Sequence, residues 1–506
     1  MIFRKIPPVL ALLSLVPFIS LGAAPAGPLL IHHVTIVDGT GAPGYAGAIR
    51  IEDGKIVAVG RDLAPHAAGA VLDGGGFTVA PGFIDTHSHH DQSIWENPTA
   101  PPLLSQGVTT MVVGQDGGFV HPVQELWNRL ERQPVAVNVA SYSGHNGLRR
   151  ASMGADFKRH TTPEELARMS EMLDTDMRAG ALGLSTGLGY DPGIYSSSDE
   201  VVALAQVAAR HGGRYISHLR SESYELWASI DELLRVGREN RMPVQISHAK
   251  LAMVSLWGRA PEFISRLDAA RAAGVDVTLD IYPYEYWQST MKVVLPKRDF
   301  TDLAAARLAL TEAMKPEGVL FGRFDADPSI VGKTLAQVAA ERKIEPARLY
   351  LDLINQSLKA GAREQIIGTS MNSEDLATLL RWPFANICSD GAIDGPHPRG
   401  AGAFARVLRL FVREQRLLTL EQAVRKMSGQ SADNMAFKNR GYLRPGYVAD
   451  LVLFNPQTIA DHATIKNPGA LATGVIRVWI NGQLVWDGDH PTGALPGRSI
   501  KRATAS

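Results

Sequence analysis

The stretches Arg214-Tyr-Ile-Ser-His218 and Val244-Gln-Ile-Ser-His248 decide the fold of this 506-residue chain. Each reads as a short apolar strand that ends in histidine, and the two histidines are thirty residues apart, which is the length of one βα unit. Strands that are joined through a helix lie parallel and side by side. We therefore expect His218 and His248 to be neighbours at the carboxyl edge of a parallel sheet.

The same alternation of apolar strands and amphipathic helices runs from residue 81 to 436 and contains eight candidate strands. Eight parallel strands close into a barrel, so we predict an α/β fold of the (β/α)₈ TIM type. The strands end near His87-Ser-His89, Gly114-Gln-Asp116, Ser143-Gly-His145, Leu184-Ser-Thr186, Ile216-Ser-His218, Ile246-Ser-His248, Asp280-Ile-Tyr282 and Cys388-Ser-Asp390. Residues from about 299 to 353 exceed what one βα connection needs, and they predict a helical insertion before the last barrel strand.

Both ends of the chain read as β-structure. Residues 27–80 alternate short apolar runs, such as Leu30 to Val37, with Gly-rich corners. Residues 437–506 carry similar runs from Gly446 to Phe454 and from Val475 to Gly482. We predict that these two parts build one small β-sandwich domain.

Residues 1–26 predict a signal peptide, because Arg4 and Lys5 precede an apolar stretch from Val9 to Leu21 and a small-residue segment. The apolar stretch is too short for a membrane span of about 20 residues, so we expect no stable membrane anchor. The protein should be exported, either periplasmic or secreted. Cys388 is the only cysteine, which excludes an intrachain disulfide.

The composition is that of a globular enzyme, with 45% hydrophobic and 20% charged residues. The 51 basic and 51 acidic residues give a formal net charge of zero. A neutral chain offers no overall electrostatic footprint for nucleic acid, so we expect a small-molecule partner and no nucleic acid. The oligomeric state stays open, with a homo-oligomer as one alternative.

Polar side chains close four of the predicted barrel strands. His87 and His89 lie two residues apart, so on an extended strand their side chains share a face. His218, His248 and Asp390 close three further strands. Barrel enzymes place catalysis at this rim, and imidazole and carboxylate groups are zinc ligands. The five side chains therefore predict a metal site.

These segments resemble the amidohydrolase superfamily and, within it, the D-aminoacylase (N-acyl-D-amino-acid deacylase) family, from about residue 28 to 500. The segments that carry the resemblance are Pro81-Gly-Phe-Ile-Asp-Thr-His-Ser-His-His-Asp91, Gly107-Val-Thr-Thr-Met-Val-Val-Gly114, Gly180-Ala-Leu-Gly-Leu-Ser-Thr-Gly-Leu188, Gln245-Ile-Ser-His-Ala-Lys250, Asp276-Val-Thr-Leu-Asp-Ile-Tyr-Pro-Tyr284, Ser389-Asp-Gly391 and His397-Pro-Arg399. The resemblance implies metal ligation by His87, His89, His218 and His248, with Asp390 as the acid/base residue beside the metal. It also implies hydrolysis of N-acyl-D-amino acids to a carboxylate and a free amino acid.

Two positions of the predicted metal site differ from those of related enzymes. Many superfamily members bridge two metals with a carboxylated lysine on strand four, but Leu182-Gly-Leu-Ser-Thr186 has none, in agreement with the deacylase branch. In that branch a cysteine commonly supplies a ligand after strand two, where this chain has Asp116. A carboxylate can bind Zn²⁺ or bridge two ions, whereas the alternative is a loop aspartate that caps a turn.

We expect one or two Zn²⁺ ions, with other divalent metals as alternatives. Asp116, His218 and His248 should hold the tighter ion, and His87 and His89 should help to hold a second one. A metal lowers the pKa of water to about 7 and polarises a carbonyl group. Asp390 is then expected to carry the proton from water to the leaving amine.

The resemblance assigns the grip on the substrate's α-carboxylate to Lys250, Tyr282 and Arg399. Such cationic and hydroxyl groups can hold a carboxylate through several hydrogen bonds. Tyr190 and Ser289 are candidates for contacts with the scissile carbonyl.

Other functions stay open on the sequence. The same metal site would serve the hydrolysis of cyclic amides, dipeptides or N-acyl-L-amino acids. A non-catalytic binding protein on the same barrel is the alternative from another class, although Asp390 and all four histidines are present. Trp287 and Tyr286 indicate either an apolar pocket wall or loop packing. We expect His145 to be a loop hydrogen-bonding residue.

Overall fold

The computed structural model describes residues 27–64, 69–118 and 121–503, and the predicted signal peptide at residues 1–26 lies outside them. Within the described ranges, no helix has both the length and the apolar character needed to cross a membrane.

The described residues contain the eight parallel strands of a barrel. Two parallel sheets, β6-β7-β8 and β9-β10-β11-β12-β13-β17, share the eight, because β9 continues β8 after Tyr142. The barrel closes between its first and last strands, where the Asp390 amide donates to the His87 carbonyl at 2.8 Å and the His89 amide donates to the Gly391 carbonyl at 2.8 Å. The strands are β6 (Phe83–Asp85), β7 (Val108–Val113), β8 (Asn138–Ser141), β9 (Ser143–Gly144), β10 (Gly183–Gly187), β11 (Arg214–His218), β12 (Val244–Ile246), β13 (Val277–Ile281) and β17 (Ala385–Ile387). The predicted barrel is thus confirmed.

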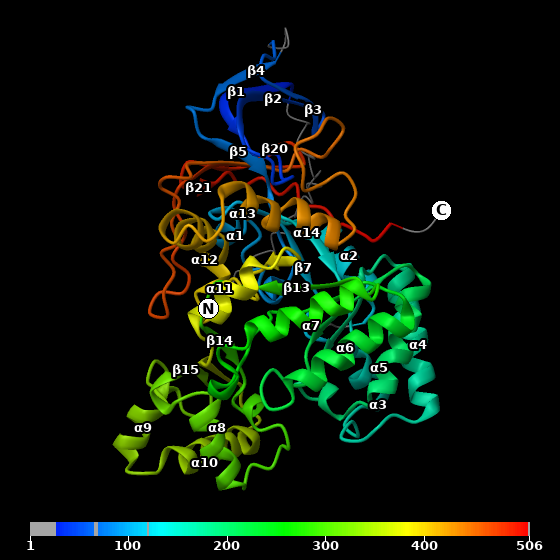
Figure 1. Cartoon of the computed structure of the whole chain (residues 1–506), viewed down its shortest axis with the longest axis vertical. Helices are drawn as coiled ribbons and strands as arrows, with labels where there is room; N and C mark the ends of the chain where they lie inside the picture. Colours follow the sequence, from blue (N-terminus) through cyan, green and yellow to red (C-terminus); the bar gives the residue numbers. More distant parts are fainter. Residues whose placement is uncertain (1–26, 65–68, 119–120, 504–506) are drawn as a thin grey trace, which may run out of the picture.

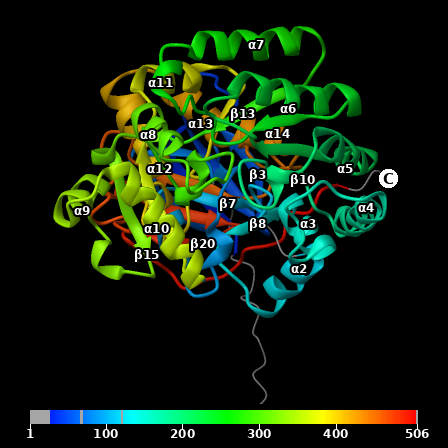
Figure 2. The same ribbon diagram turned by 90° about the horizontal axis from the view of Figure 1, so that it is seen from below.

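Helices cover the outside of the barrel, as Figure 2 shows for α4 (Pro163–Arg178), α5 (Ser198–Arg210), α6 (Leu226–Asn240) and α7 (Ala260–Ala272). Helix α4 begins with a capping box, in which Thr162 and Glu165 each accept a hydrogen bond from the other's backbone amide. Its buried Met169, Leu173 and Met177 recur every four residues and face the strands. Burial of each such side chain stabilises the fold by about 1.5–3 kcal/mol.

One nine-stranded sheet joins the two ends of the chain, at the top of Figure 1. Strand β5 pairs antiparallel with β18, so the N-terminal strands continue directly into the C-terminal ones. The sheet has its own core, which includes Ile31, Ile49, Val79 and Leu453. The strands are β1 (Leu29–Ile36), β2 (Tyr45–Glu52), β3 (Lys55–Gly60), β4 (Ala70–Asp73), β5 (Thr78–Pro81), β18 (Leu451–Phe454), β19 (Val475–Ile480), β20 (Gln483–Asp487) and β21 (His490–Pro491). Both ends therefore build one domain, as predicted.

The insertion before β17 contains the expected helices, but it is longer and also contains a sheet. Its helices are α8 (Leu303–Glu312), α9 (Leu335–Arg342) and α10 (Pro346–Ala360). Its antiparallel sheet has the order β14-β16-β15, built from Tyr286–Ser289, Glu364–Thr369 and Val319–Phe324. A register shift between Phe321 and Arg323 interrupts the alternation that would mark β15 in the sequence. The insertion projects from the barrel at the lower left of Figure 1.

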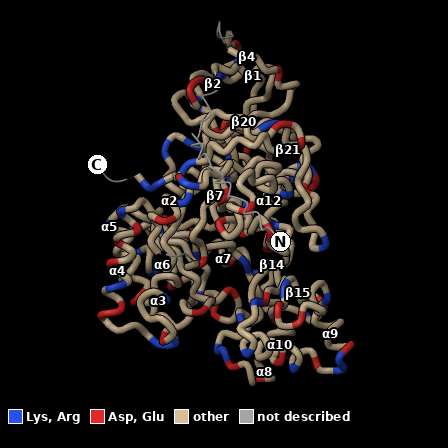
Figure 3. Tube along the Cα trace, turned by 180° about the vertical axis from the view of Figure 1, so that it is seen from behind, with Lys and Arg blue, Asp and Glu red and all other residues tan. Residues whose placement is uncertain are grey.

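The C-terminal segment after the sheet runs back along the barrel. The Val139 amide of β8 donates to the Arg498 carbonyl at 2.9 Å, and the Ile500 amide donates to the Val139 carbonyl at 2.7 Å. Acidic and basic residues are interspersed along the chain in Figure 3, in keeping with the balanced net charge.

Candidate active site

The barrel rim brings together the six predicted metal ligands. In the first group, the Nε2 atom of His89 lies 3.3 Å from Asp116 Oδ2 and 3.3 Å from Asp390 Oδ1. The Nε2 atom of His87 lies 3.4 Å from Asp116 Oδ1 and 3.5 Å from Asp390 Oδ1. These four residues could hold one ion, because their ligand atoms all lie within 4.8 Å of one another.

A second group of possible ligands consists of Asp116, His218 and His248. The Nε2 atom of His248 lies 3.4 Å from Asp116 Oδ1 and 2.9 Å from Nδ1 of His218. Asp116 belongs to both groups, so its carboxylate lies between the two candidate ion positions.

Three ligands sit on left-handed backbone directly after their strands. The φ angles are +54° at Asp116, +34° at His248 and +50° at Asp390. A non-glycine residue in this region costs of order 1–3 kcal/mol and persists where the surrounding structure enforces it. The strained turns aim these side chains at a common point, which is a typical feature of functional sites.

Buried atoms without partners show that the site fits a cation. Neither ring nitrogen of His87, nor Oδ1 of Asp116, makes a hydrogen bond within the described residues. Buried polar atoms normally have partners, because an unsatisfied one costs about 1–3 kcal/mol. Imidazole nitrogens and carboxylate oxygens are suitable donors for Zn²⁺.

Electrostatics set the charges at the rim. Burial disfavours charge on all these groups, yet the cation of Arg399 and the nearby histidines hold the pKa of Asp390 well below its usual range. The pKa of Asp116 is likewise held well below its usual range by His87 and His248, against the effect of burial. Burial lowers the pKa of His218 to about 4. Ionised carboxylates and a neutral imidazole are the forms that bind metals. Burial lowers the pKa of His89, but its contacts with Asp116 and Asp390 outweigh burial and raise the pKa to about 9, so a metal at this position would displace a proton.

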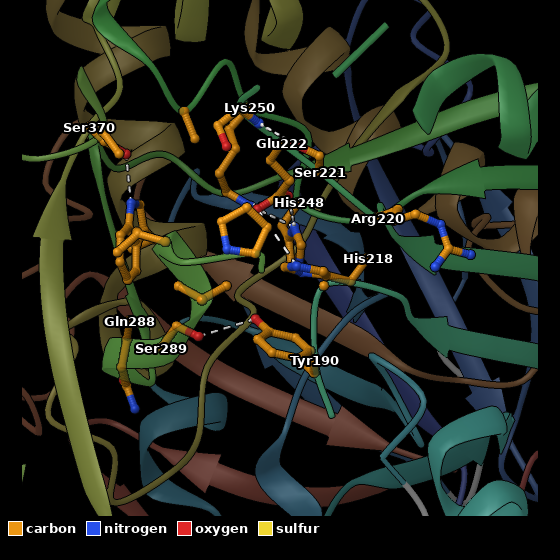
Figure 4. Close-up of a pocket in the computed structure, with 18 of the residues that line it drawn as sticks. Tyr190, His218, Arg220, Ser221, Glu222, His248, Lys250, Gln288, Ser289 and Ser370 are labelled. Carbon is orange, nitrogen blue, oxygen red and sulfur yellow. Dashed lines mark hydrogen bonds and ion pairs between the residues drawn. The ribbon is translucent and has the colours of Figure 1, made fainter. Parts of the chain in front are cut away.

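A cavity opens next to these ligands, between the barrel rim and the insertion (Figure 4). Asp390, His218 and His248 line it. The predicted substrate residues Tyr190, Lys250, Tyr282 and Ser289 also line it. The Ser289 hydroxyl donates to the Tyr190 hydroxyl at 3.3 Å, which connects the insertion to the loop after β10.

Arg399 is not among the residues that line the cavity. It is the first residue of α12 (Arg399–Arg406), and its guanidinium donates to Asp390 Oδ2 at 2.5 Å. The guanidinium also lies 4.9 Å from the centre of the Tyr282 ring. Arg399 therefore contacts the proposed acid/base residue directly.

Part of the cavity wall is apolar. This part is formed by Trp287, Val293, Val294, Pro296 and Ala313. The indole of Trp287 donates to Ser370 Oγ at 2.6 Å, which fixes the ring. Trp287 thus forms part of a pocket wall, whereas the neighbouring Tyr286 packs on His397 with ring centres 4.8 Å apart.

Two carboxylates that the sequence analysis missed contact the metal-binding histidines. Glu222 Oε1 lies 3.0 Å from His248 Nδ1, and Asp280 Oδ1 lies 3.7 Å from His87 Nδ1. The available signal for Asp280 was an acidic residue inside the apolar strand β13. For Glu222 the only signal was its position four residues after His218.

Two other polar residues have structural roles. His145 Nε2 lies 2.8 Å from Glu200 Oε1, and Arg149 pairs with the same carboxylate. The buried thiol of Cys388 donates to Asp280 Oδ1 at 3.2 Å.

Known proteins are similar to this chain in both sequence and fold. The model of the Amidohydrolase family matches residues 70–315 and 301–486. A D-aminoacylase of Alcaligenes xylosoxydans xylosoxydans is 35% identical, over 94% of this chain and 98% of the relative. A solved D-aminoacylase structure, described in terms of a binuclear metal centre with one-metal activation and second-metal attenuation, has a TM-score of 0.84 and 32% identity, and covers 94% of this chain and 99% of its own.

A second solved structure comes from Bordetella bronchiseptica. It is an N-acyl-D-glutamate deacylase in complex with zinc and a phosphonate inhibitor that mimics the tetrahedral intermediate. Its TM-score is 0.84 at 32% identity, and the match covers 94% of this chain and 100% of that one.

Proposed function

This chain belongs to the amidohydrolase family, and from that premise we propose that it is a metal-dependent deacylase of N-acyl-D-amino acids with apolar side chains. The observation that carries the proposal is the cavity, which joins a cation-binding rim to polar groups suited to a carboxylate and to an apolar wall. Water attacks the acyl carbonyl, the C–N bond breaks, and the products are a carboxylate and a free amino acid.

The ligands would hold one or two divalent ions, Zn²⁺ above all, with Asp116 shared between the positions. When bound, the metal supplies Lewis acidity for the acyl carbonyl and lowers the pKa of water to about 7. Asp390 takes a proton from the attacking water and delivers it to the leaving nitrogen. Arg399 holds Oδ2 of Asp390, so the other carboxylate oxygen faces the rim.

The substrate's α-carboxylate binds to Lys250 and Tyr282. The hydroxyl of Tyr282 is buried and has no hydrogen-bond partner among the described residues, so a carboxylate oxygen would satisfy it. The ammonium of Lys250 lies 5.9 Å from the centre of the Tyr282 ring. Arg399 supports this clamp from behind the ring while it holds Asp390.

An apolar substrate side chain fits the apolar part of the cavity wall, which includes Trp287, Val293 and Val294. Of the two cations that line the cavity, Lys250 is assigned to the α-carboxylate, and Arg220 pairs with Glu232 at 2.7 Å. An acidic side chain would be desolvated there without a free cation, which is costly. We therefore place this enzyme with deacylases of neutral D-amino acids.

The configuration of the substrate follows from three fixed directions at its α-carbon. The carboxylate points to Lys250 and Tyr282, the acyl carbonyl to the metal ligands, and the side chain to the apolar wall. One enantiomer satisfies all three contacts, and the resemblance to D-aminoacylases favours the D form.

The test is a substrate panel on zinc-loaded protein, with a chelated sample as the control. We expect kcat/KM for N-acetyl-D-leucine to exceed the values for N-acetyl-L-leucine, N-acetyl-D-glutamate and N-acetyl-D-leucinamide by at least ~10²-fold, the cost of leaving buried polar groups unpaired. Equal rates for the D and L forms would overturn the stereochemical assignment. Equal rates for the acid and its carboxamide would show that Lys250 and Tyr282 do not recognise a carboxylate, and would favour a cyclic-amide substrate.

We also propose that the protein is exported to the periplasm or secreted. The support is the order of basic, apolar and small residues within 1–26. Mature protein from the native host should begin between about Ala23 and Pro28, as measured by N-terminal sequencing. An intact Met1 on the soluble protein would contradict cleavage.

A further inference from the structure

Three buried groups form a triangle beside the candidate metal ligands (Figure 4). The Lys250 ammonium donates to Glu222 Oε1 at 2.6 Å, and the same oxygen lies 3.0 Å from His248 Nδ1. The third side of the triangle is 2.7 Å long, from Lys250 Nζ to His248 Nδ1. The exposed fractions of the side chains are 4% for Lys250, 14% for Glu222 and 2% for His248, so water competes little for these contacts.

The triangle contains two arrangements that exclude each other. A neutral imidazole has one N–H group and one lone pair, so Nδ1 of His248 either donates to Glu222 or accepts from Lys250. If Nδ1 donates, the lone pair is on Nε2, which faces Asp116 Oδ1 at 3.4 Å. If Nδ1 accepts, Nε2 carries the hydrogen and cannot bind a metal.

We propose that Glu222 is a positioning residue that selects the metal-binding tautomer of His248, in competition with Lys250 for its Nδ1 atom. A substrate carboxylate that binds Lys250 then removes the competing donor and strengthens metal binding. Carboxylate and metal binding are therefore coupled, and the coupling acts equally in both directions. This inference rests on the proposed function, because it takes His248 as a ligand and Lys250 as part of the clamp.

Another buried histidine of the candidate metal site, His87, supports this assignment by contrast. His87 Nδ1 faces Asp280 at 3.7 Å, and its contacts within the described residues include no lysine. Carboxylates that orient a metal-binding histidine are common, and their loss typically costs 10–100-fold in metal affinity. Only at His248 does a lysine contend for the same nitrogen in the part of the chain that the structure describes. The backbone supports Glu222 as well, because its carbonyl accepts from the Ala252 amide at 2.9 Å.

The first experiment is a double-mutant cycle on Zn²⁺ affinity, measured on metal-free full-length protein by competition with a chromophoric chelator. Glu222→Gln should weaken Zn²⁺ binding about 10–100-fold. Lys250→Met alone should raise the affinity at least 3-fold because the competing donor is gone, and for the same reason the double variant should regain most of the loss. Additive effects, or an unchanged affinity in Glu222→Gln, would overturn the proposal.

Glu232→Gln is the matched control, because Glu232 pairs with Arg220 near the same loop and contacts no proposed ligand. It should bind Zn²⁺ as the wild type does. Thermal unfolding midpoints of the metal-free variants separate a folding defect from a ligand defect. If Glu222→Gln does not fold, Glu222→Asp takes its place, and it should lose affinity that Lys250→Met again restores.

The second experiment tests the coupling with 4-methylpentanoate, which has the carboxylate of leucine without its amino group. This probe should raise the Zn²⁺ affinity of the wild type at least 3-fold, while the uncharged 4-methylpentanamide should not. An increase that persists in Lys250→Met would mean that the carboxylate acts on the metal directly, and the coupling would be wrong. Failure of the cycle in a protein that still cleaves N-acetyl-D-leucine removes only this inference, whereas a successful cycle without deacylation removes only the proposed function.

Discussion

Asp116 belongs to both groups of candidate metal ligands, whereas each histidine belongs to only one. Its Oδ2 faces His89 at 3.3 Å, and its Oδ1 faces both His87 and His248 at 3.4 Å. A carboxylate in this place is a harder donor than a thiolate, so it favours hard cations more than a cysteine would.

The first prediction concerns this shared ligand. Asp116→Ala should reduce metal content at both positions, whereas His89→Ala should leave the ion held by Asp116, His218 and His248. Elemental analysis of the purified proteins measures both. Equal metal content in Asp116→Ala and the wild type would show that Asp116 is not a ligand.

The second prediction concerns proton transfer by Asp390. Asp390→Asn keeps the size of the side chain but cannot take up a proton as the carboxylate does, so kcat should fall at least ~10²-fold. The fold should persist, which circular dichroism can check. Turnover close to that of the wild type would end the assignment.

The third prediction concerns Glu364, a buried carboxylate on β16 that accepts from the Met291 amide at 2.9 Å. Burial raises its pKa from 4.5 to about 7. Between these values the folded protein keeps a proton that the unfolded chain has lost, so stability falls as pH rises through this window. Glu364→Gln removes the penalty, which is about 3 kcal/mol at most. Its unfolding midpoint should exceed that of the wild type at pH 8 and approach it at pH 5; an equal difference at both values would contradict this.

At the scale of residues, the sequence predicted the groups that close strands. His218 ends its strand and the other five ligands follow theirs within a few residues, so the topology alone places all six at one rim. Glu222 and Asp280 contact His248 and His87, which are far from them in the sequence. The spacing of residues along the chain does not predict such contacts. Arg399 was predicted to bind substrate, and its hydrogen bond to Asp390 came from the fold of the loop before α12.

At the scale of elements, the insertion completes the substrate cavity. Arg298 connects it to the loop after β10, since its guanidinium donates to the Gly189 carbonyl at 2.7 Å and to Asp191 at 3.0 Å. The same side chain donates to the carbonyls of Lys292 and Leu295 in the insertion. One arginine thus fixes the apolar wall relative to Tyr190.

The fourth prediction follows from this connection. Arg298→Ala should raise KM for N-acetyl-D-leucine about 10-fold, because the wall is no longer held, while metal content stays unchanged. Steady-state kinetics with elemental analysis measure both. Arg323→Ala is the control, because Arg323 pairs with Asp325 on the exposed side of the insertion. A similar rise in both variants would point to a general effect on the insertion.

The insertion also shows where prediction from the sequence stopped. Its helices have an amphipathic period that a single segment reveals, as in α10. Its strands are short, and they pair across long separations, such as Tyr286 with Thr369. Pairing of that kind is decided by packing rather than by local pattern.

At the scale of the whole molecule, the C-terminal segment supports the barrel from outside. Residues 498–500 pair with β8, and Arg502 donates to the carbonyls of Met177, Ala181 and His211. The fifth prediction is that a chain ending at Pro496 loses these bonds and unfolds at least ~1 °C lower, as expected for a loss of about 1 kcal/mol in a chain of this length. Calorimetry measures the midpoint, and an unchanged midpoint would show that the segment adds nothing.

The pairing of β5 with β18 makes the order of synthesis matter. The ribosome makes β5 several hundred residues before β18, and at 5–20 residues per second the wait is roughly 20 to 75 s. During that time the newborn β1 to β5 have an open strand edge and an uncovered apolar face, the features that invite aggregation. A polypeptide that stops before Leu451 would contain every barrel strand, but the edge of β5 would still be unpaired. During synthesis, the strands that carry the candidate active site are therefore complete before β18 covers the aggregation-prone edge of β5.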